Sequence, residues 1–157
     1  MKSIKPFPPR KVRPCVFEYI YFARPDSMLD GKTAYEHRKN LGSELAKEND
    51  INADIVVPVP DSGNAAALGF AQFLNVKFEL GLVRNHYVGR TFIEPSQKIR
   101  SLGVKLKLNA NQSTIQGKKI ILVDDSLVRG TTSHKIVKML YDAGAKEVHV
   151  RIACPEI

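Results

Sequence analysis

The sequence predicts an α/β fold in which a central, mainly parallel sheet is flanked by helices. Short apolar runs typical of buried strands alternate with helical segments along the 157 residues. A strand followed by a helix and another strand is the connection expected in a parallel sheet. Two of the apolar runs end in turns rich in acidic, hydroxyl and glycine residues, where open α/β sheets bind ligands.

The composition fits one domain with an ordinary core. The sequence contains no apolar run of about eighteen residues and no signal peptide, so we expect no membrane segment and a cytoplasmic location. Cys15 and Cys154 give neither a disulfide framework nor a paired metal-ligand spacing, and we expect Cys15 to be a small packed side chain. The net charge of +8 permits an anionic partner. Without a nucleic-acid motif, we expect a polyphosphate substrate and no nucleic acid.

The first half of the chain predicts an arm and several regular elements. Residues 1–14 carry four prolines among basic residues and predict an extended arm or linker. The aromatic run 15–22 predicts a strand, and residues 33–48 predict a helix. Residues 54–60 predict an apolar strand that ends in prolines, and an alanine-rich helix follows to about Leu74.

The second half continues the alternation. Residues 78–83 predict a short strand. The polar stretch 84–100 has no regular period and is long for a connection, so it is either functional or mobile. Residues 105–108 indicate a strand or an extended segment.

The last elements form a strand, helix and strand. An apolar strand at 120–123 leads to an amphipathic helix from about Ser133, with Gly144 as the expected helix stop. Residues 147–153 alternate in the manner of a half-buried strand.

The segment 120–132, IILVDDSLVRGTT, carries the strongest functional signal. Adjacent acids at a strand end can engage ligand hydroxyl groups or a divalent cation. The amino terminus of the following helix attracts phosphate. Together these features predict a sugar phosphate ligand. The alternative, a turn whose acids only cap a helix and hold surface water, is the minority explanation because the full order of residues matches the first hypothesis.

A second turn, PVPDSG at residues 58–63, could present backbone amides to another anion. Its alternative is a helix N-cap formed by Asp61, Ser62 or Asn64. Taken by itself, this turn is better explained as a helix N-cap than as an anion site. Beside the downstream motif, two turns at neighbouring strand ends could hold the two phosphate ends of one substrate.

Residues 84–93, RNHYVGRTFI, mix cations, aromatics and glycine. They could form an exposed, solvated loop. They could also form a lid that closes over the reacting centre, excludes water and brings positive charge to a departing pyrophosphate.

These segments resemble a known family. Residues 120–132 resemble the phosphoribosyl pyrophosphate (PRPP) motif of type I phosphoribosyltransferases. Residues 88–93, with Pro95, Gln97 and Arg100, resemble the flexible catalytic loop of the glutamine PRPP amidotransferase family. The similarity covers about residues 15–157 and includes FEYIYFARPDS at 17–27. It implies a type I phosphoribosyltransferase fold with an incomplete hood.

The resemblance implies a role for each site residue. It places the ribose hydroxyls on the two acids, the 5-phosphate in the following loop and the pyrophosphate in the earlier turn. The implied magnesium ligands are Ser62, Asp124 and Asp125. The implied substrate-binding residues are Asp61, Ser62, Gly63, Asp124, Asp125, Ser126, Leu127, Val128, Arg129, Gly130, Thr131, Thr132 and Ser133. In the lid, Arg84 and His86 stand where the family usually has lysine and arginine, which are not equivalent at a phosphate. We therefore assign the catalytic role to Tyr87 and Arg90.

The implied reaction forms 5-phosphoribosylamine and pyrophosphate from PRPP and ammonia, the first step of de novo purine synthesis. No general base is obvious, so catalysis would consist of positioning and charge stabilisation. In the family an amino-terminal glutaminase domain supplies the ammonia, and we expect that domain to be absent from this chain. The sequence leaves open whether the protein forms a homo-oligomer.

Two further expectations follow from the resemblance. Some members hold an iron–sulfur cluster with a cysteine at the place of Cys15 and others beyond the residues here, and one cysteine cannot hold such a cluster, so we expect none. The alternatives to the transferase are a non-catalytic PRPP-binding module or an inactive fragment, and a transferase that acts on a free base.

Overall fold

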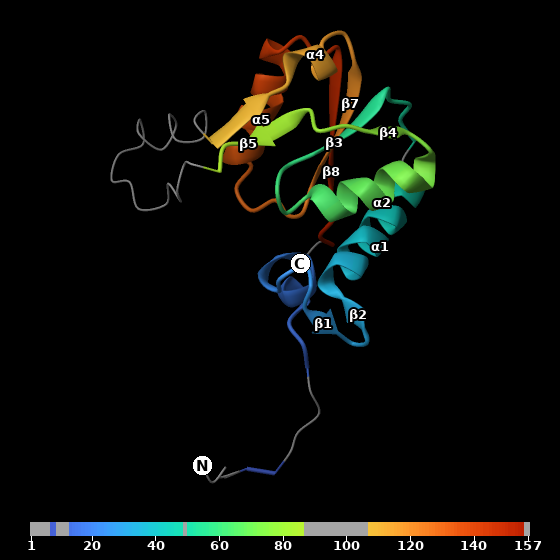
Figure 1. Ribbon diagram of the computed structural model, residues 1–157, viewed down its shortest axis with the longest axis vertical. Helices are drawn as coiled ribbons and strands as arrows, with labels where there is room; N and C mark the ends of the chain where they lie inside the picture. Colours follow the sequence, from blue (N-terminus) through green and yellow to red (C-terminus); the bar gives the residue numbers. More distant parts are fainter. Residues whose placement is uncertain (1–6, 9–12, 49, 87–106, 156–157) are drawn as a thin grey trace, which may run out of the picture.

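A four-stranded parallel sheet forms the centre of the protein. The computed structural model describes residues 7–8, 13–48, 50–86 and 107–155 (Figure 1). The strand order is β4–β3–β7–β8, and every neighbouring pair is parallel. The strands are β4 (Lys77–Phe78), β3 (Ile55–Pro58), β7 (Lys119–Asp124) and β8 (Glu147–Ile152). The predicted α/β fold with a mainly parallel sheet is confirmed.

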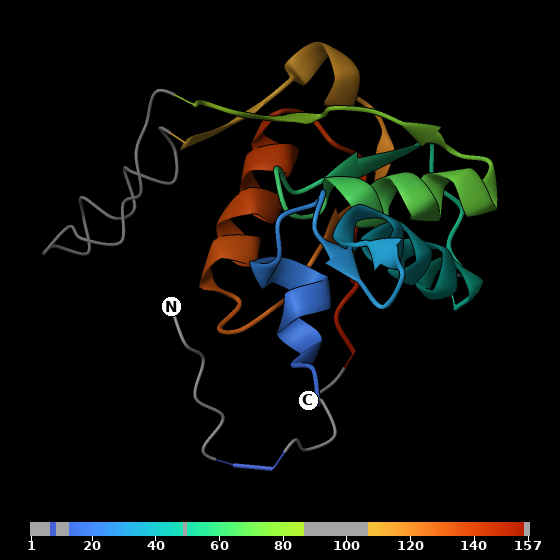
Figure 2. The ribbon, with the colours of Figure 1, turned by 60° about the horizontal axis from the view of Figure 1, so that its bottom comes forward.

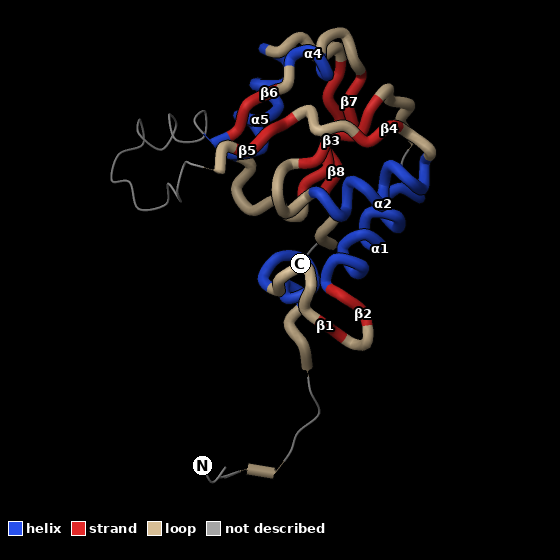
Figure 3. Tube along the Cα trace, in the orientation of Figure 1, coloured by secondary structure: helices blue, strands red, loops and turns tan. Residues whose placement is uncertain are grey.

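Helices cover both faces of this sheet, because its central strands are apolar on both faces. Figure 3 shows α1 (Ala34–Lys47) and α2 (Asn64–Leu74) on one side, and α5 (Thr131–Asp142) on the other. Successive side chains of a strand point to opposite faces. Val56, Ile121 and Val123 therefore join the core beneath α2. The alternate residues, Ile55, Val57, Ile120 and Leu122, join the core beneath α5.

The helices α1 and α2 touch backbone to backbone. A β-carbon at Gly42 would lie 1.8 Å from the carbonyl oxygen of Ala66, and one at Gly69 would lie 1.9 Å from that of Lys39. The predicted helix at 33–48 is confirmed, and it begins with a capping box in which Thr33 and Glu36 exchange hydrogen bonds. The alanine-rich helix ending at Leu74 is also confirmed.

The predicted strand at 15–22 is wrong. Glu18–Phe22 forms a short π-helical segment, η1, beside the first turns of α1 (Figure 2). Aromatic residues favour strands where their side chains pack against cross-strand and same-face neighbours. Here Ile20 is buried but Tyr21 and Phe22 are 55% and 66% exposed, so the segment packs on α1 through Ile20 and through Tyr19, whose ring contacts that of His37. An unpredicted hairpin of β1 (Met28–Leu29) and β2 (Lys32–Thr33) follows.

The predicted strand at 78–83 is two strands in different sheets. Phe78 ends β4, and β5 (Leu82–Arg84) pairs antiparallel with β6 (Leu108–Ala110). Gly81 separates them, where a β-carbon would lie 2.9 Å from the side chain of Val57. The chain therefore passes over the sheet at that point. The extended segment predicted at 105–108 is described only from residue 107, and Leu108 begins β6.

The remaining elements agree with the sequence apart from their limits. The short helix α4 (Gln112–Ile115) was not predicted. Helix α5 begins at Thr131, two residues earlier than expected, and Gly144 follows its end with φ +92°. In the arm, residues 7, 8, 13 and 14 are in neither helix nor strand, and the others lie outside the described residues.

Two remaining findings concern the surface. Cys15 is exposed, so the packed role expected for it is wrong, because none of the described residues covers its side chain. None of the helices that the structure describes is long and apolar enough to cross a membrane.

Candidate active site

Two turns lie side by side at the carboxyl ends of β3 and β7. The strands pair in register, with Pro58 opposite Val123, and the amide of Val59 donates to the carbonyl of Val123 at 2.9 Å. A β-carbon at Gly63 would lie 2.6 Å from that same carbonyl oxygen. Glycine is therefore required where the β3–α2 turn crosses the end of β7. The structure thus brings together the two turns that the sequence predicted as neighbours.

The helices that leave these turns begin without side-chain caps. The N-cap residues are Gly63 for α2 and Gly130 for α5, neither helix has an acidic residue in its first turn, and Gly130 has a φ of +69° that favours glycine. Their first amides therefore keep the capacity to bind an anion. The capping alternative for Asp61, Ser62 and Asn64 is not what the described residues form. No hydrogen bond joins those side chains to the first-turn amides, whereas α1 carries a complete capping box.

Asp124 and Asp125 lie at the end of β7, and hydrogen bonds fix their orientation. The amide of Asp125 donates to Oδ1 of Asp124 at 2.9 Å, and Oγ of Ser126 donates to Oδ1 of Asp125 at 3.0 Å. The amides of Ala153 and Cys154, just beyond β8, donate to the backbone carbonyls of Asp124 and Asp125 at 3.0 and 2.9 Å. The backbone of the two acids is therefore held by the segment that follows β8.

The electrostatics of this pair favour a cation or hydroxyl donors. Asp125 is only 7% exposed. Burial, and secondarily the charge of Asp125, raises the pKa of Asp124 to about 7. Two partly desolvated carboxylates side by side are stabilised when positive charge or hydrogen-bond donors approach them.

The donor set fits a magnesium ion that is completed by a substrate. Within the described residues, no group of three or more His, Cys, Asp or Glu side chains could hold a metal ion by itself. Magnesium commonly binds one or two carboxylates together with waters and substrate phosphates. Asp124 and Asp125, with the hydroxyl of Ser62 on the neighbouring turn, match that pattern.

Arg84 joins the base of the predicted lid to the earlier turn. Its guanidinium donates to the carboxylate of Asp61 in an ion pair between the end of β5 and the β3–α2 turn. The sequence placed both residues near the phosphates but did not predict that they pair. The catalytic residues predicted in the lid, Tyr87 and Arg90, lie outside the described residues, and their roles stay predictions.

Arg38 is a residue near the site that the sequence analysis missed. It lies on α1, is 8% exposed, and lines a small cavity with Ser62 and Asp125. The buried residues of α1 recur every four positions, at Ala34, Arg38, Gly42 and Ala46. A cation within such a buried series was the signal that could have revealed it.

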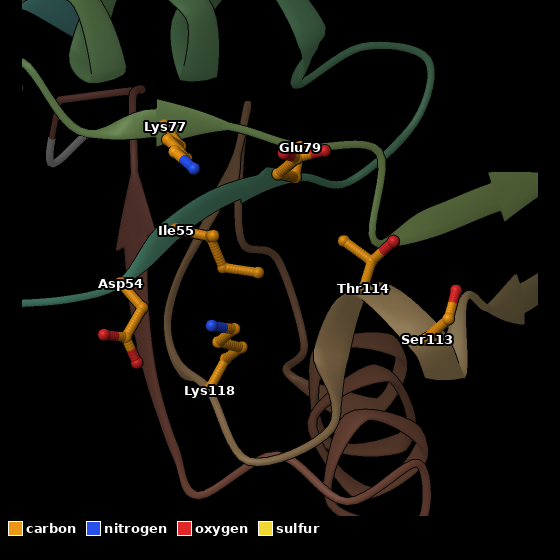
Figure 4. A pocket seen from close by; sticks show the side chains of 7 residues that line it. All are labelled: Asp54, Ile55, Lys77, Glu79, Ser113, Thr114 and Lys118. Carbon is orange, nitrogen blue, oxygen red and sulfur yellow. The ribbon is translucent and has the colours of Figure 1, made fainter.

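A second cavity, of about 340 Å³, lies at the opposite end of the sheet, near the starts of β3, β4 and β7 (Figure 4). Its lining residues are Asp54, Ile55, Lys77, Glu79, Ser113, Thr114 and Lys118. Most of these side chains are exposed to solvent. Because parallel sheets bind their ligands at the carboxyl ends of the strands, we assign the substrate site to the other end.

Comparison with known proteins identifies the domain. Residues 26–155 match the phosphoribosyl transferase domain family. The chain belongs to the phosphoribosyltransferase family. The type I fold expected from the sequence is therefore confirmed, and so is the assignment to a transferase family.

Individual proteins within this family show which members the chain is similar to. Amidophosphoribosyltransferase of Rhizobium etli is 61% identical over 98% of this chain and 31% of its own length. The solved structure of the allosteric regulatory enzyme of purine biosynthesis is 55% identical, with a TM-score of 0.80, over 90% of this chain and 30% of its own. That of glutamine PRPP amidotransferase from B. subtilis, complexed with ADP and GMP, is 55% identical, with a TM-score of 0.81, over 91% and 31%.

These comparisons confirm the resemblance to the amidotransferase family for the phosphoribosyltransferase domain. This chain spans about a third of the length of the relatives it matches. The magnesium site, the absence of an iron–sulfur cluster, the cytoplasmic location and the incomplete hood stay predictions, and the oligomeric state stays open.

Proposed function

We propose that this domain forms 5-phosphoribosylamine and pyrophosphate from PRPP and ammonia, which is the first step of de novo purine synthesis. The observation that carries the proposal is the pairing of two uncapped helix termini with the Asp124–Asp125 pair at neighbouring strand ends. One ligand with a phosphate at each end and hydroxyls between them matches this arrangement. The similarity to amidophosphoribosyltransferases supports ammonia as the nucleophile.

Each part of the site binds one part of PRPP in this proposal. The loop 126–133 holds the 5-phosphate on the first amides of α5. Residues 61–63 hold the pyrophosphate on the first amides of α2. The carboxylates of Asp124 and Asp125 accept hydrogen bonds from the ribose hydroxyls, which the burial of Asp125 strengthens by limiting competition from water.

Magnesium fits the same residues. Ser62, Asp124 and Asp125 would hold it together with oxygens of PRPP, and the bound ion would neutralise part of the pyrophosphate charge. The residues of the chain then orient the two phosphate ends, so that the bond to be broken lies over the Asp124–Asp125 pair.

The chemistry requires one bond to form and one to break. The lone pair of ammonia attacks the anomeric carbon of the ribose, the bond from that carbon to the pyrophosphate oxygen breaks, and the new ammonium group releases a proton to water. Ammonia is already a nucleophile, so positioning and charge stabilisation suffice. We propose that Tyr87 and Arg90 act from the lid, and that Arg84 screens Asp61 beside the departing pyrophosphate.

The proposed setting follows the family. In the full-length enzyme a glutaminase domain would supply the ammonia, and the reaction would take place in the cytoplasm. We propose no nucleic-acid or membrane partner.

A non-catalytic PRPP-binding module is the second candidate. The observation that favours it is that the two uncapped helix starts and the Asp124–Asp125 pair form a complete phosphate and hydroxyl binding arrangement without the lid. PRPP binding alone would need only the turns and the two acids.

Two measurements on the intact chain test the proposal. PRPP is titrated by calorimetry in the presence of Mg²⁺, and pyrophosphate release is followed with ammonium as the nucleophile. We expect binding and release, with both lost in Asp124→Ala. The matched control is Asp142→Ala, an exposed acid at the end of α5, which should retain both. Binding without release would favour the module, and failure of the intact chain to bind PRPP would refute both candidates.

A further inference from the structure

Arg38 is a buried cation that makes no ion pair within the described residues. Its Nε donates to the carbonyl of Tyr19 and its Nη2 to the carbonyl of Ala23, both at 2.8 Å. Neutral carbonyls satisfy two of the N–H groups of Arg38 but do not neutralise its charge, and a buried charge is costly without an opposite charge nearby. Burial lowers the pKa of Arg38, and the negative charge of Asp125 acts in the opposite direction.

One carboxylate oxygen of Asp125 lacks a hydrogen-bond partner among the described residues. Its Oδ1 accepts from Ser126, whereas its Oδ2 is buried and has no hydrogen-bond partner in the described part of the chain. Arg38 and Asp125 line one cavity of about 10 Å³, together with Ser62 of the neighbouring turn. That volume is close to the space one water molecule needs. Arg38, the buried cation, and Asp125, whose Oδ2 has no partner, therefore border one small cavity beneath the site that is otherwise lined mainly by apolar residues.

We propose that Arg38 is a positioning residue that orients the carboxylate of Asp125 for PRPP binding by its charge across this cavity. The inference rests on the proposed function of the Asp124–Asp125 pair. Ser126 fixes one carboxylate oxygen, and Arg38 orients the other. Arg38 acts through Asp125 and not on the substrate.

A purely structural role for Arg38 makes a different prediction. The two hydrogen bonds to the η1 region, at Tyr19 and Ala23, fasten that segment to α1. They need the forked guanidinium, which lysine cannot reproduce, whereas positioning of Asp125 needs the positive charge, which lysine retains. Arg38→Lys and Arg38→Gln therefore separate the two roles.

The experiment measures PRPP affinity by calorimetry with Mg²⁺ and the urea midpoint of unfolding, both on the full chain. We expect Arg38→Gln to weaken PRPP binding by roughly tenfold to a hundredfold, the range typical when a residue that orients a ligating group is lost. Arg38→Lys should bind within about threefold of the native chain although its midpoint falls, because it keeps the charge and loses the fork. The control Arg24→Gln removes the same charge from an exposed arginine near η1 and should change neither quantity.

A double variant tests the coupling without any ligand. If Arg38 compensates the buried charge of Asp125, then Asp125→Asn should recover at least part of the midpoint lost in Arg38→Gln. The recovery is measurable even if the native chain binds no PRPP, in which case the proposed function fails and the coupling is still decided. If Arg38→Gln alone does not fold, the double variant should fold better.

Two results would overturn the proposal. One is equal loss of affinity in Arg38→Lys and Arg38→Gln, which would mean that only the guanidinium fork matters. The other is a double variant no more stable than Arg38→Gln, which would mean that the two charges are not coupled.

Discussion

Asp124 should lower the free energy of unfolding of the ligand-free domain as the pH rises. A substitution that cannot ionise at this position should remove that pH dependence. The pKa of Asp124 is raised from 3.8 to about 7. The folded chain therefore keeps this carboxyl protonated up to about pH 7, whereas the unfolded chain ionises it near the ordinary value. The folded state binds more protons across this interval, so the free energy of unfolding falls as the pH rises through it.

The size of the effect follows from the same interval. The difference between 3.8 and about 7 corresponds to an upper limit on the order of 4 kcal/mol. Roughly two thirds of this free energy of unfolding is lost between pH 5 and pH 8. Partial contact of the Asp124 side chain with solvent reduces the expected loss in that interval to about 2 kcal/mol. Asparagine cannot ionise, yet its oxygen can still accept the hydrogen bond from the amide of Asp125.

Urea unfolding of the native chain and Asp124→Asn at pH 5 and pH 8 measures this difference. The variant should be the more stable protein, and its advantage should grow by about 2 kcal/mol between the two pH values. The control Asp142→Asn removes an exposed carboxylate that pairs with Lys138 at 3.0 Å. Its stability should stay within about 0.5 kcal/mol of the native chain at both pH values.

The reasoning fails if the advantage of Asp124→Asn does not grow with pH, or if the variant is the less stable protein at pH 8. The same variant should bind PRPP poorly. Greater stability with weaker binding is the pattern expected of a residue retained for its function.

Three further substitutions have expected outcomes. Gly63→Ala would place a β-carbon 2.6 Å from a backbone oxygen of β7, so it should lower the free energy of unfolding in urea by about 2 kcal/mol and weaken PRPP binding in calorimetry. Gly42→Ala would place one 1.8 Å from the carbonyl oxygen of Ala66, so it should cost at least about 3 kcal/mol in urea unfolding, and a smaller loss would contradict the backbone contact. Arg84→Gln leaves Asp61 unneutralised beside the pyrophosphate turn, so calorimetry should show weaker PRPP binding while urea unfolding changes by less than about 1 kcal/mol; unchanged binding would exclude the screening role.

The sequence predicted the centre of the sheet because its two central strands, β3 and β7, are apolar on both faces. Residues 55–57 and 120–123 are all buried, so a continuous apolar run was a sufficient signal. The strand prediction for residues 15–22 failed because their aromatic side chains suggested a strand, whereas the structure leaves two of the four, Tyr21 and Phe22, exposed to solvent. The segment 78–83 failed because a local pattern does not reveal that the chain leaves one sheet for another at Gly81.

The same distinction separates the features of the candidate site that the sequence predicted from those that it did not. The two turns were predictable because a strand end, a turn and a helix start are contiguous in the chain. The ion pair of Arg84 with Asp61 and the position of Arg38 behind Asp125 were not predictable, because they depend on how separate elements pack.

At Gly42 and Gly69 the backbones of α1 and α2 are in direct contact, because neither glycine places a side chain between them. At these two positions the distance between the helices is therefore limited by backbone atoms and not by side-chain rotamers. Arg38 lies on α1 and Ser62 lies just before α2, so the distance between these two residues depends on how closely the helices pack. Changes elsewhere on the outer faces of the two helices can accumulate without altering how far the buried cation stands from the phosphate-binding turn.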